Sequence, residues 1–211
     1  MGQQSVLVIV DVQNDFCKGG SLAVPQGEQV VAMANRLMPY FDLVVATQDW
    51  HPANHISFAA NHPGSHVGAS IMVQGIAQLL WPTHCVQGSV GAQFHPALDV
   101  TRINRIFHKG TNKGVDSYST FFDNARKHHT GLDAYLKEQG VIQLYIMGLA
   151  TDYCVKFSVL DALSLGYEVN VIEDACRGVD LTPGDSEAAL TEMVTRGAKR
   201  VLVRDVIAAM E

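Results

Sequence analysis

Long apolar segments are absent from this sequence. No stretch approaches the roughly 18 apolar residues that a membrane-spanning helix needs, and no basic segment leads into a signal-like apolar core near the first residue. The apolar run between Ser5 and Asp11 is too short for export and instead predicts a buried strand. We therefore expect a cytoplasmic protein whose partners do not include a membrane.

Cysteine and charge are both sparse. Four cysteines, Cys17, Cys85, Cys154 and Cys176, are scattered along 211 residues without a paired spacing, which favours reduced thiols and again the cytoplasm. Charged residues make up 17% of the chain, and the formal net charge is −6 with no long run of one sign. We do not expect nucleic acid to be the main partner of such a protein.

The sequence does contain a repeating order of strand and helix signals. Short runs rich in β-branched residues predict strands at 6–10, 43–47, 105–108, 143–147, 168–172 and 200–203. Apolar residues at helical spacing predict helices at 28–38, 152–165 and 185–196. This alternation predicts a three-layer α/β fold, in which helices cover both faces of a parallel sheet of about six strands. Because no linker or internal repeat is visible, we expect residues 1–211 to form one domain.

The region around 49–98 does not follow this alternation. It is rich in His, Gly and Pro and shows little periodicity. Long irregular loops in compact domains are commonly either functional or disordered. The Trp and His residues of this region favour a functional loop.

Residues whose side chains could act in catalysis or bind a metal follow four of the predicted strands. Asp11 ends the first strand, Asp49 and His51 follow the second, Lys109 ends the third, and Cys154 comes shortly after the fourth. Ligands of an open parallel sheet bind beyond the carboxyl ends of the strands. We therefore expect these side chains to share one rim of the sheet.

Three of these residues have both a chemical and a structural interpretation. Cys154, at the start of a predicted helix, is either a nucleophile that the helix N-terminus favours as a thiolate or a buried core cysteine. Asp11 is either a turn former or an acid–base group whose pKa the apolar strand raises. Lys109 is either solvated or a cation that holds Cys154 as a thiolate and orients Asp11. The local pattern leaves all three pairs of alternatives open.

A metal site is a further candidate. Asp49 and His51 are two residues apart, so an extended backbone points both side chains the same way. Further histidines follow in the same region, namely His55, His62, His66, His84 and His95. One Asp and two His, completed by water, suit zinc, iron(II) or manganese and leave positions open for a substrate. The alternative is a His-rich surface loop that binds no metal.

Six segments occur in one order along nearly the whole chain: Val10–Gly20, Thr47–Pro52, Trp81–Val86, Phe107–Gly110, Asp116–Ser119 and Gly148–Val155. Together they resemble the nicotinamidase branch of the isochorismatase-like cysteine hydrolases. This resemblance implies the same six-stranded parallel sheet. It also implies an amidohydrolase with a catalytic triad of Asp11, Lys109 and Cys154.

The resemblance implies one divalent transition metal and no organic cofactor. Asp49, His51 and His84 would bind the metal, with His55 as a further candidate ligand. The metal would anchor the ring nitrogen of the substrate, nicotinamide, and present its carboxamide to Cys154. A thioester would form as ammonia leaves, and water would hydrolyse it to nicotinate. Pyrazinamide, a near-isostere, is expected to be accepted as well.

The resemblance also assigns the surroundings of the nucleophile. The backbone amides of Ala150 and Cys154 would form an oxyanion hole after a cis peptide bond, and Phe16, Trp81 and Tyr118 would line a pocket that suits a flat ring. The alternative for these three residues is that they are ordinary core aromatics.

Two rival functions are a metal-binding protein without catalysis and a thiol redox enzyme. The Cys-x-x-Cys pair expected of a redox enzyme is missing from this sequence. Homo-oligomer formation is left open.

Overall fold

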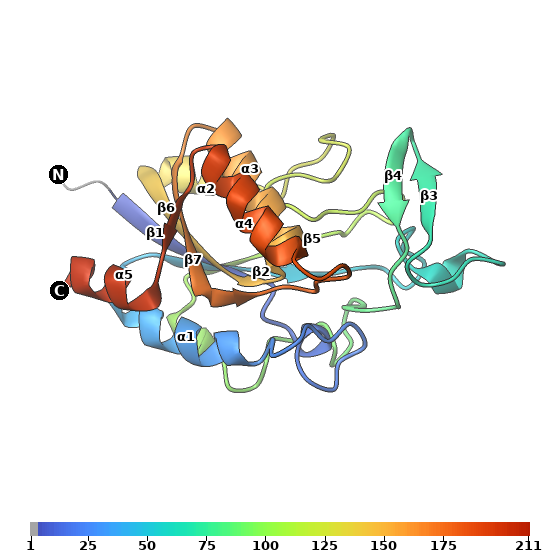
Figure 1. Cartoon of the computed structure of the whole chain (residues 1–211), viewed down its shortest axis with the longest axis horizontal. Coiled ribbons are helices and arrows are strands. Elements are labelled where there is room, and N and C mark those ends of the chain that lie inside the picture. The colour runs from blue at the N-terminus through green and yellow to red at the C-terminus, as the bar shows by residue number, and fades with distance from the viewer. Residues whose placement is uncertain (1–3) are drawn as a thin grey trace.

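The architecture is a parallel sheet between two layers of helices. A computed structural model describes residues 4–211, and Figure 1 shows how its elements are arranged. Six strands form the sheet in the order β5-β2-β1-β6-β7-β8, and every neighbouring pair is parallel. These strands are β1 (Gln4–Val10), β2 (Val44–Asp49), β5 (Arg105–Lys109), β6 (Val141–Leu149), β7 (Glu168–Arg177) and β8 (Lys199–Val201). The prediction of an α/β fold with about six parallel strands is confirmed.

The central strand β1 explains why the sequence shows apolar runs rather than alternation. Its residues from Val6 to Val10 are fully buried, because helices cover both faces of the sheet. Leu7 pairs with Val44 on β2 and with Tyr145 on β6. Burial of a large apolar side chain contributes roughly 1.5–3 kcal/mol, so this strand anchors the core. The strand order also sets the carboxyl ends of β5, β2, β1 and β6 next to one another.

Helices flank the sheet on both sides (Figure 1). The elements α1 (Gln29–Leu37) and α5 (Val203–Met210) cover one face, and α2 (Leu132–Glu138), α3 (Lys156–Ser164) and α4 (Asp185–Thr195) cover the other. The first of these helices, α1, turns Val30, Val31, Ala34 and Leu37 into the core, as its apolar spacing predicts.

Two helices and several element boundaries differ from the sequence prediction. The short helices α2 and α5 are not predicted, and the strand predicted to reach residue 203 ends at Val201, so that Val203 begins α5. A short apolar run fits a strand or a helix equally well. The helix predicted at 152–165 begins instead with a π-helical turn, η5 (Thr151–Val155), before α3. Such turns are frequent at functional sites.

The segment between β2 and β5 is largely irregular, as expected. Its regular parts are the 3-10 turns η3 (Ala59–Asn61) and η4 (Val100–Arg102) and an antiparallel hairpin, β3 (Ser70–Val73) and β4 (Ile76–Leu79), which lies apart from the main sheet (Figure 1). This hairpin is not predicted from the sequence. Its turn residues Gln74 and Gly75 both have positive φ, as a two-residue hairpin turn requires. Two further 3-10 turns are η1 (Asn14–Phe16) and η2 (Met38–Tyr40).

None of the helices within residues 4–211 combines the length and the apolar character that a membrane crossing requires.

Candidate active site

Three of the predicted side chains meet where β1, β5 and β6 end. The Nζ atom of Lys109 lies 2.9 Å from Asp11 Oδ2 and 3.3 Å from Cys154 Sγ. Thr47 Oγ1 donates a hydrogen bond of 2.7 Å to the other carboxylate oxygen of Asp11. Asp11, Lys109 and Cys154 are all buried. The structure therefore brings the three residues together and excludes the interpretation of Lys109 as a solvated side chain.

The charge of Lys109 is balanced inside the protein. Its ammonium forms ion pairs with Asp11 and Asp49 and donates a hydrogen bond of 3.0 Å to the carbonyl oxygen of Ser117. Burial alone would lower the pKa of Lys109, but the two carboxylates outweigh burial and hold this pKa well above its ordinary value. Lys109 is therefore a fixed cation between two anions.

Burial moves the thiol and the carboxylate toward their neutral forms. It raises the pKa of Cys154 well above its ordinary value, although the Lys109 ammonium opposes this shift. Desolvation is thus the larger effect on the thiol, and the Lys109 ammonium offsets part of it. Burial also raises the pKa of Asp11, and Lys109 again opposes it. One carboxylate oxygen of Asp11 lies within 4.8 Å of Cys154 Sγ, so a carboxylate with improved basicity lies beside a neutral thiol.

Cys154 sits in a tight connection between β6 and α3. The Leu149–Ala150 peptide bond is cis, as the resemblance implies, and Cys154 lies in the turn η5. Gly148 has a φ of 122°, and a Cβ atom there would lie 2.2 Å from a backbone oxygen of β1. Only glycine allows β6 to pass β1 so closely just before the nucleophile. Ala150 and Cys154 both face the same pocket.

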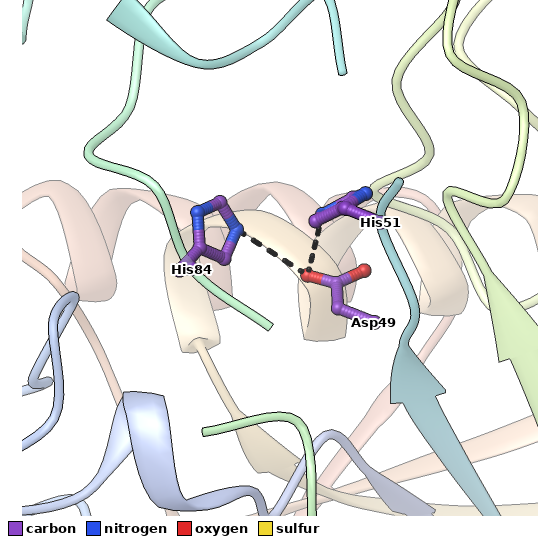
Figure 2. Close-up of side chains that lie close together, drawn as sticks. All are labelled: Asp49, His51 and His84. Carbon is purple, nitrogen blue, oxygen red and sulfur yellow. Dashed lines mark ion pairs between the residues drawn. The ribbon is translucent and has the colours of Figure 1, made fainter. Parts of the chain in front are cut away.

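Asp49, His51 and His84 form a compact group beside this cluster. The Nε2 atoms of His51 and His84 lie 3.5 and 3.8 Å from Asp49 Oδ2, as Figure 2 shows. The Nδ1 atom of His51 hydrogen-bonds the carbonyl oxygen of Gly110 at 2.9 Å, and that of His84 hydrogen-bonds the carbonyl of Pro82 at 2.8 Å. A carbonyl only accepts, so each Nδ1 acts as a donor, which leaves each Nε2 as the ring atom that could bind a metal. This donor set fits a divalent metal ion.

His55 lies next to this group but has a different hydrogen-bond pattern. Its Nδ1 atom is 2.7 Å from Ser57 Oγ, and its Nε2 atom is 3.2 Å from the carbonyl oxygen of Val115. Both ring nitrogens are therefore engaged, and neither presents a lone pair toward Asp49. Burial lowers the pKa of His55 to about 4, with a smaller contribution from the neighbouring His51. In this arrangement His55 supports the ring of His51, on which it stacks at 4.1 Å.

The pocket above Cys154 contains all three aromatic residues implied by the resemblance. Phe16, Trp81 and Tyr118 line it together with Cys154 and His84. Trp81 Nε1 donates a hydrogen bond of 3.2 Å to Tyr118 Oη, and the ring of Phe16 lies 5.5 Å from the ring of His84. The thiol, Asp49 and His84 thus open onto one aromatic-walled space.

Sequence reasoning missed four further residues of this pocket, namely Leu22, Asp116, Tyr153 and Val179. Tyr153 precedes Cys154 directly and Asp116 opens the segment Asp116–Ser119, so both lay in segments that the sequence singles out; the ring of Tyr153 lies 4.9 Å from that of Trp81. Leu22 and Val179 belong to loops that only the folded chain brings to the pocket. Asp116 also lies with His51 and His55 in a second group of candidate donor atoms, all within 4.8 Å of one another.

Two local features hold the loops that carry the histidines. The carboxylate of Asp15, in η1, accepts a hydrogen bond of 2.7 Å from the backbone N–H of Cys85, which directly follows His84. Gly110 has a φ of 64°, and a Cβ atom there would lie 2.2 Å from Cε1 of His51. Glycine is needed at this position because the His51 ring packs against the backbone it hydrogen-bonds.

Sequence similarity relates the chain to proteins of known family. The isochorismatase domain matches residues 5–205. A nicotinamidase of Escherichia coli (strain K12) is 53% identical over 203 residues, which cover 94% of this chain and 95% of that protein.

Solved structures agree with this relationship. The structure of a nicotinamidase and pyrazinamidase of Acinetobacter baumanii has a TM-score of 0.94 at 46% identity and covers 98% of this chain and 99% of its own. The pyrazinamidase of Pyrococcus horikoshii in complex with zinc has a TM-score of 0.78 at 38% identity, covering 94% and 99%. With a domain match over almost its whole length and relatives this similar, the chain belongs to the isochorismatase family.

Proposed function

We propose that this protein is a nicotinamidase, which hydrolyses nicotinamide to nicotinate and ammonia through a thioester on Cys154. The observation that carries the proposal is the placement of a buried thiol, carboxylate and ammonium at the base of an aromatic-walled pocket that Asp49 and His84 also line. The identity of 53% to the Escherichia coli nicotinamidase supports the same substrate.

The first half of the reaction transfers the acyl group to sulfur. Asp11 accepts the proton of the Cys154 thiol, and the thiolate attacks the carboxamide carbon to form a C–S bond. The backbone N–H groups of Ala150 and Cys154 stabilise the oxyanion, an effect worth roughly 3–4 kcal/mol for one such donor. Lys109 holds Asp11 in place and offsets the negative charge that appears on the sulfur. Asp11 then gives the proton to the departing nitrogen, the C–N bond breaks, and ammonia leaves.

The second half regenerates the thiol. Asp11, again a carboxylate, takes a proton from a water molecule, which attacks the thioester carbon. The C–S bond breaks as the proton returns from Asp11 to sulfur, and the acid leaves and loses its remaining proton to water as nicotinate. One group therefore acts as base and as acid in both halves, which its raised pKa favours.

Asp49, His51 and His84 are the residues that would hold a divalent metal. A bound metal would accept the lone pair of the pyridine nitrogen and so orient the ring. Zinc, iron(II) and manganese all suit this donor set, and the Pyrococcus horikoshii relative was solved with zinc. Phe16, Trp81 and Tyr118 would pack against the flat ring. We expect pyrazinamide to be accepted too, because a ring nitrogen in place of a C–H changes the shape little.

Ammonia release from nicotinamide by the purified protein tests the proposal. The native protein should release ammonia, and both the Cys154→Ala variant and chelator-treated protein should not. Cys176→Ala is the matched control, because this buried cysteine lies on β7 outside the pocket and its loss should leave turnover intact. A metal-loaded native protein that releases no ammonia from nicotinamide would refute the assignment of substrate.

A further inference from the structure

The side chain of Gln13 lies wholly inside the protein and touches the backbone of Asp49. Its Nε2 donates hydrogen bonds of 2.8 Å to the carbonyl oxygens of Asp49 and Ala92, and its Oε1 accepts a hydrogen bond of 2.8 Å from the N–H of Asp49. Gln13 is 0% exposed. One amide group thus binds both backbone polar groups of Asp49.

This contact lies beyond the point at which the pairing of β2 with β1 ends. The pairing of β2 with β1 runs from Leu7–Val44 to Ile9–Ala46 and does not reach Asp49 in the part of the chain that the structure describes. On the other side, Asp49 is paired with Lys109 of β5. The Gln13 amide therefore takes the place that a neighbouring strand would occupy.

The carboxylate of Asp49 needs this support because its two oxygens have different partners. Oδ1 pairs with the Lys109 ammonium, and Oδ2 faces the Nε2 atoms of His51 and His84 (Figure 2). A small rotation or shift of the Asp49 backbone would move both oxygens at once. The carboxylate can contact Lys109 and face the two histidines at once only if the Asp49 backbone is fixed both by β5 and by Gln13.

We propose that Gln13 is a positioning residue for the metal group, which fixes the backbone of Asp49 so that Oδ2 converges with His51 and His84. This inference rests on the proposed metal site but not on the identity of the substrate. Partners that orient a metal ligand typically contribute 10–100-fold to metal affinity. Gln13 has no hydrogen bond to either histidine, so we expect it to act on the metal group through the backbone of Asp49.

The chain offers a matched control in Gln48. This second buried glutamine donates a hydrogen bond of 2.7 Å to the same Ala92 carbonyl oxygen, but it makes no hydrogen bond to the backbone of Asp49. Gln13→Met and Gln48→Met each remove one hydrogen bond to Ala92 and keep the side-chain volume. Only Gln13→Met also frees the N–H and carbonyl of Asp49.

The test is the zinc affinity of metal-free native protein and both variants, measured by competition with a chromophoric chelator, together with the thermal midpoint of each metal-free protein. We expect Gln13→Met to bind zinc at least about 10-fold more weakly than the native protein, and Gln48→Met to keep native affinity. Native affinity in Gln13→Met, or equal weakening in both variants, would overturn the proposal, because the amide would then serve only the Ala92 loop.

A second variant covers the case in which Gln13→Met does not fold. Gln13→Glu keeps the acceptor for the Asp49 N–H but turns an oxygen toward two carbonyl oxygens, so it should also weaken zinc binding at least about 10-fold. Native affinity in folded Gln13→Glu would equally overturn the proposal. No nicotinamide is present in these titrations, so their result is independent of the ammonia assay.

Discussion

The candidate site has two halves that the protein builds in different ways. The strand-end half comprises Asp11, Lys109 and Cys154, which the parallel sheet brings together and buried ion pairs hold. The loop half comprises His51 and His84, which the irregular segment carries and hydrogen bonds to backbone carbonyls orient. Asp49 joins the halves, since its two carboxylate oxygens face one half each. Because the two halves are held by different contacts, we expect that a substitution can remove turnover without removing metal binding, and the reverse.

The largest expected effect is in the strand-end half. Cys154→Ala removes the atom that bonds to the acyl group, so turnover of nicotinamide should fall at least about 10⁴-fold. Metal content should be unchanged, because no residue of the Asp–His–His group hydrogen-bonds the thiol within residues 4–211. Ammonia release and elemental analysis of the same sample check both statements. Substantial residual turnover would show that another residue is the nucleophile.

Asp11→Asn, like Cys154→Ala, should lower turnover without changing the metal content. Loss of the base should lower turnover about 10²–10⁴-fold, while the metal content stays native. Asparagine also tolerates the φ of 49° at this position, so the backbone should be retained. Metal loss in this variant would instead make Asp11 part of the metal group and undo the division into halves.

His84→Ala should have the opposite signature. Removing one of three ligands should weaken zinc affinity by at least about 100-fold, while the strand-end triad keeps its contacts. His95→Ala is the control, because His95 lies in the same irregular segment but outside the Asp–His–His group. Zinc titration of the two variants gives the comparison. Equal zinc affinity in both would exclude His84 as a ligand.

Gly110→Ala tests how the loop half is oriented. The new Cβ would lie 2.2 Å from the His51 ring in a backbone conformation with positive φ, so we expect a loss of about 1–3 kcal/mol in the free energy of unfolding and weaker zinc binding. Gly114→Ala is the control, since the nearest atom to its Cβ is a side-chain oxygen of Asn112 at 3.6 Å. Denaturant unfolding of the metal-free proteins measures the difference. Equal stability in the two variants would mean that the His51 ring moves freely.

The smallest effect concerns His55 and pH. Its pKa is about 4 in the folded protein, below the ordinary value of 6.5, so between these pH values the unfolded chain binds a proton that the folded chain does not. Stability of metal-free protein should therefore fall as pH drops from 6.5 toward 4. In His55→Gln the unfolding free energy should fall less steeply with pH, because the difference in bound protons between the unfolded and folded chain is smaller by up to about one. Parallel stability curves for the two proteins would show that His55 titrates normally.

The sequence is informative about the strand-end half because β-branched runs mark the strands and ligands bind beyond their ends. Local pattern alone did not decide the roles of Asp11 and Lys109; the family resemblance selected their chemical interpretation. Their burial and mutual contact are visible only in the fold, as is the raised pKa of Cys154. Desolvation depends on neighbours that are distant in sequence, so no local pattern reports it.

The loop half was less predictable. His84 and His55 look alike in the sequence, and the difference lies in which ring nitrogen a carbonyl occupies, at Pro82 for one and Val115 for the other. The contacts of Gln13 and Asp116 were missed because their partners are distant in the sequence. Irregular backbone has no periodicity from which such contacts can be read.

The thioester on Cys154 is the feature that can be observed most directly. Native protein would be mixed with nicotinamide, quenched in acid within one turnover, digested and analysed by mass spectrometry. We predict a nicotinoyl adduct on the peptide that contains Cys154, formed together with ammonia and absent from Cys154→Ala. Ammonia release without an adduct on this peptide, or with an adduct on another residue, would contradict a cysteine amidohydrolase centred on Cys154.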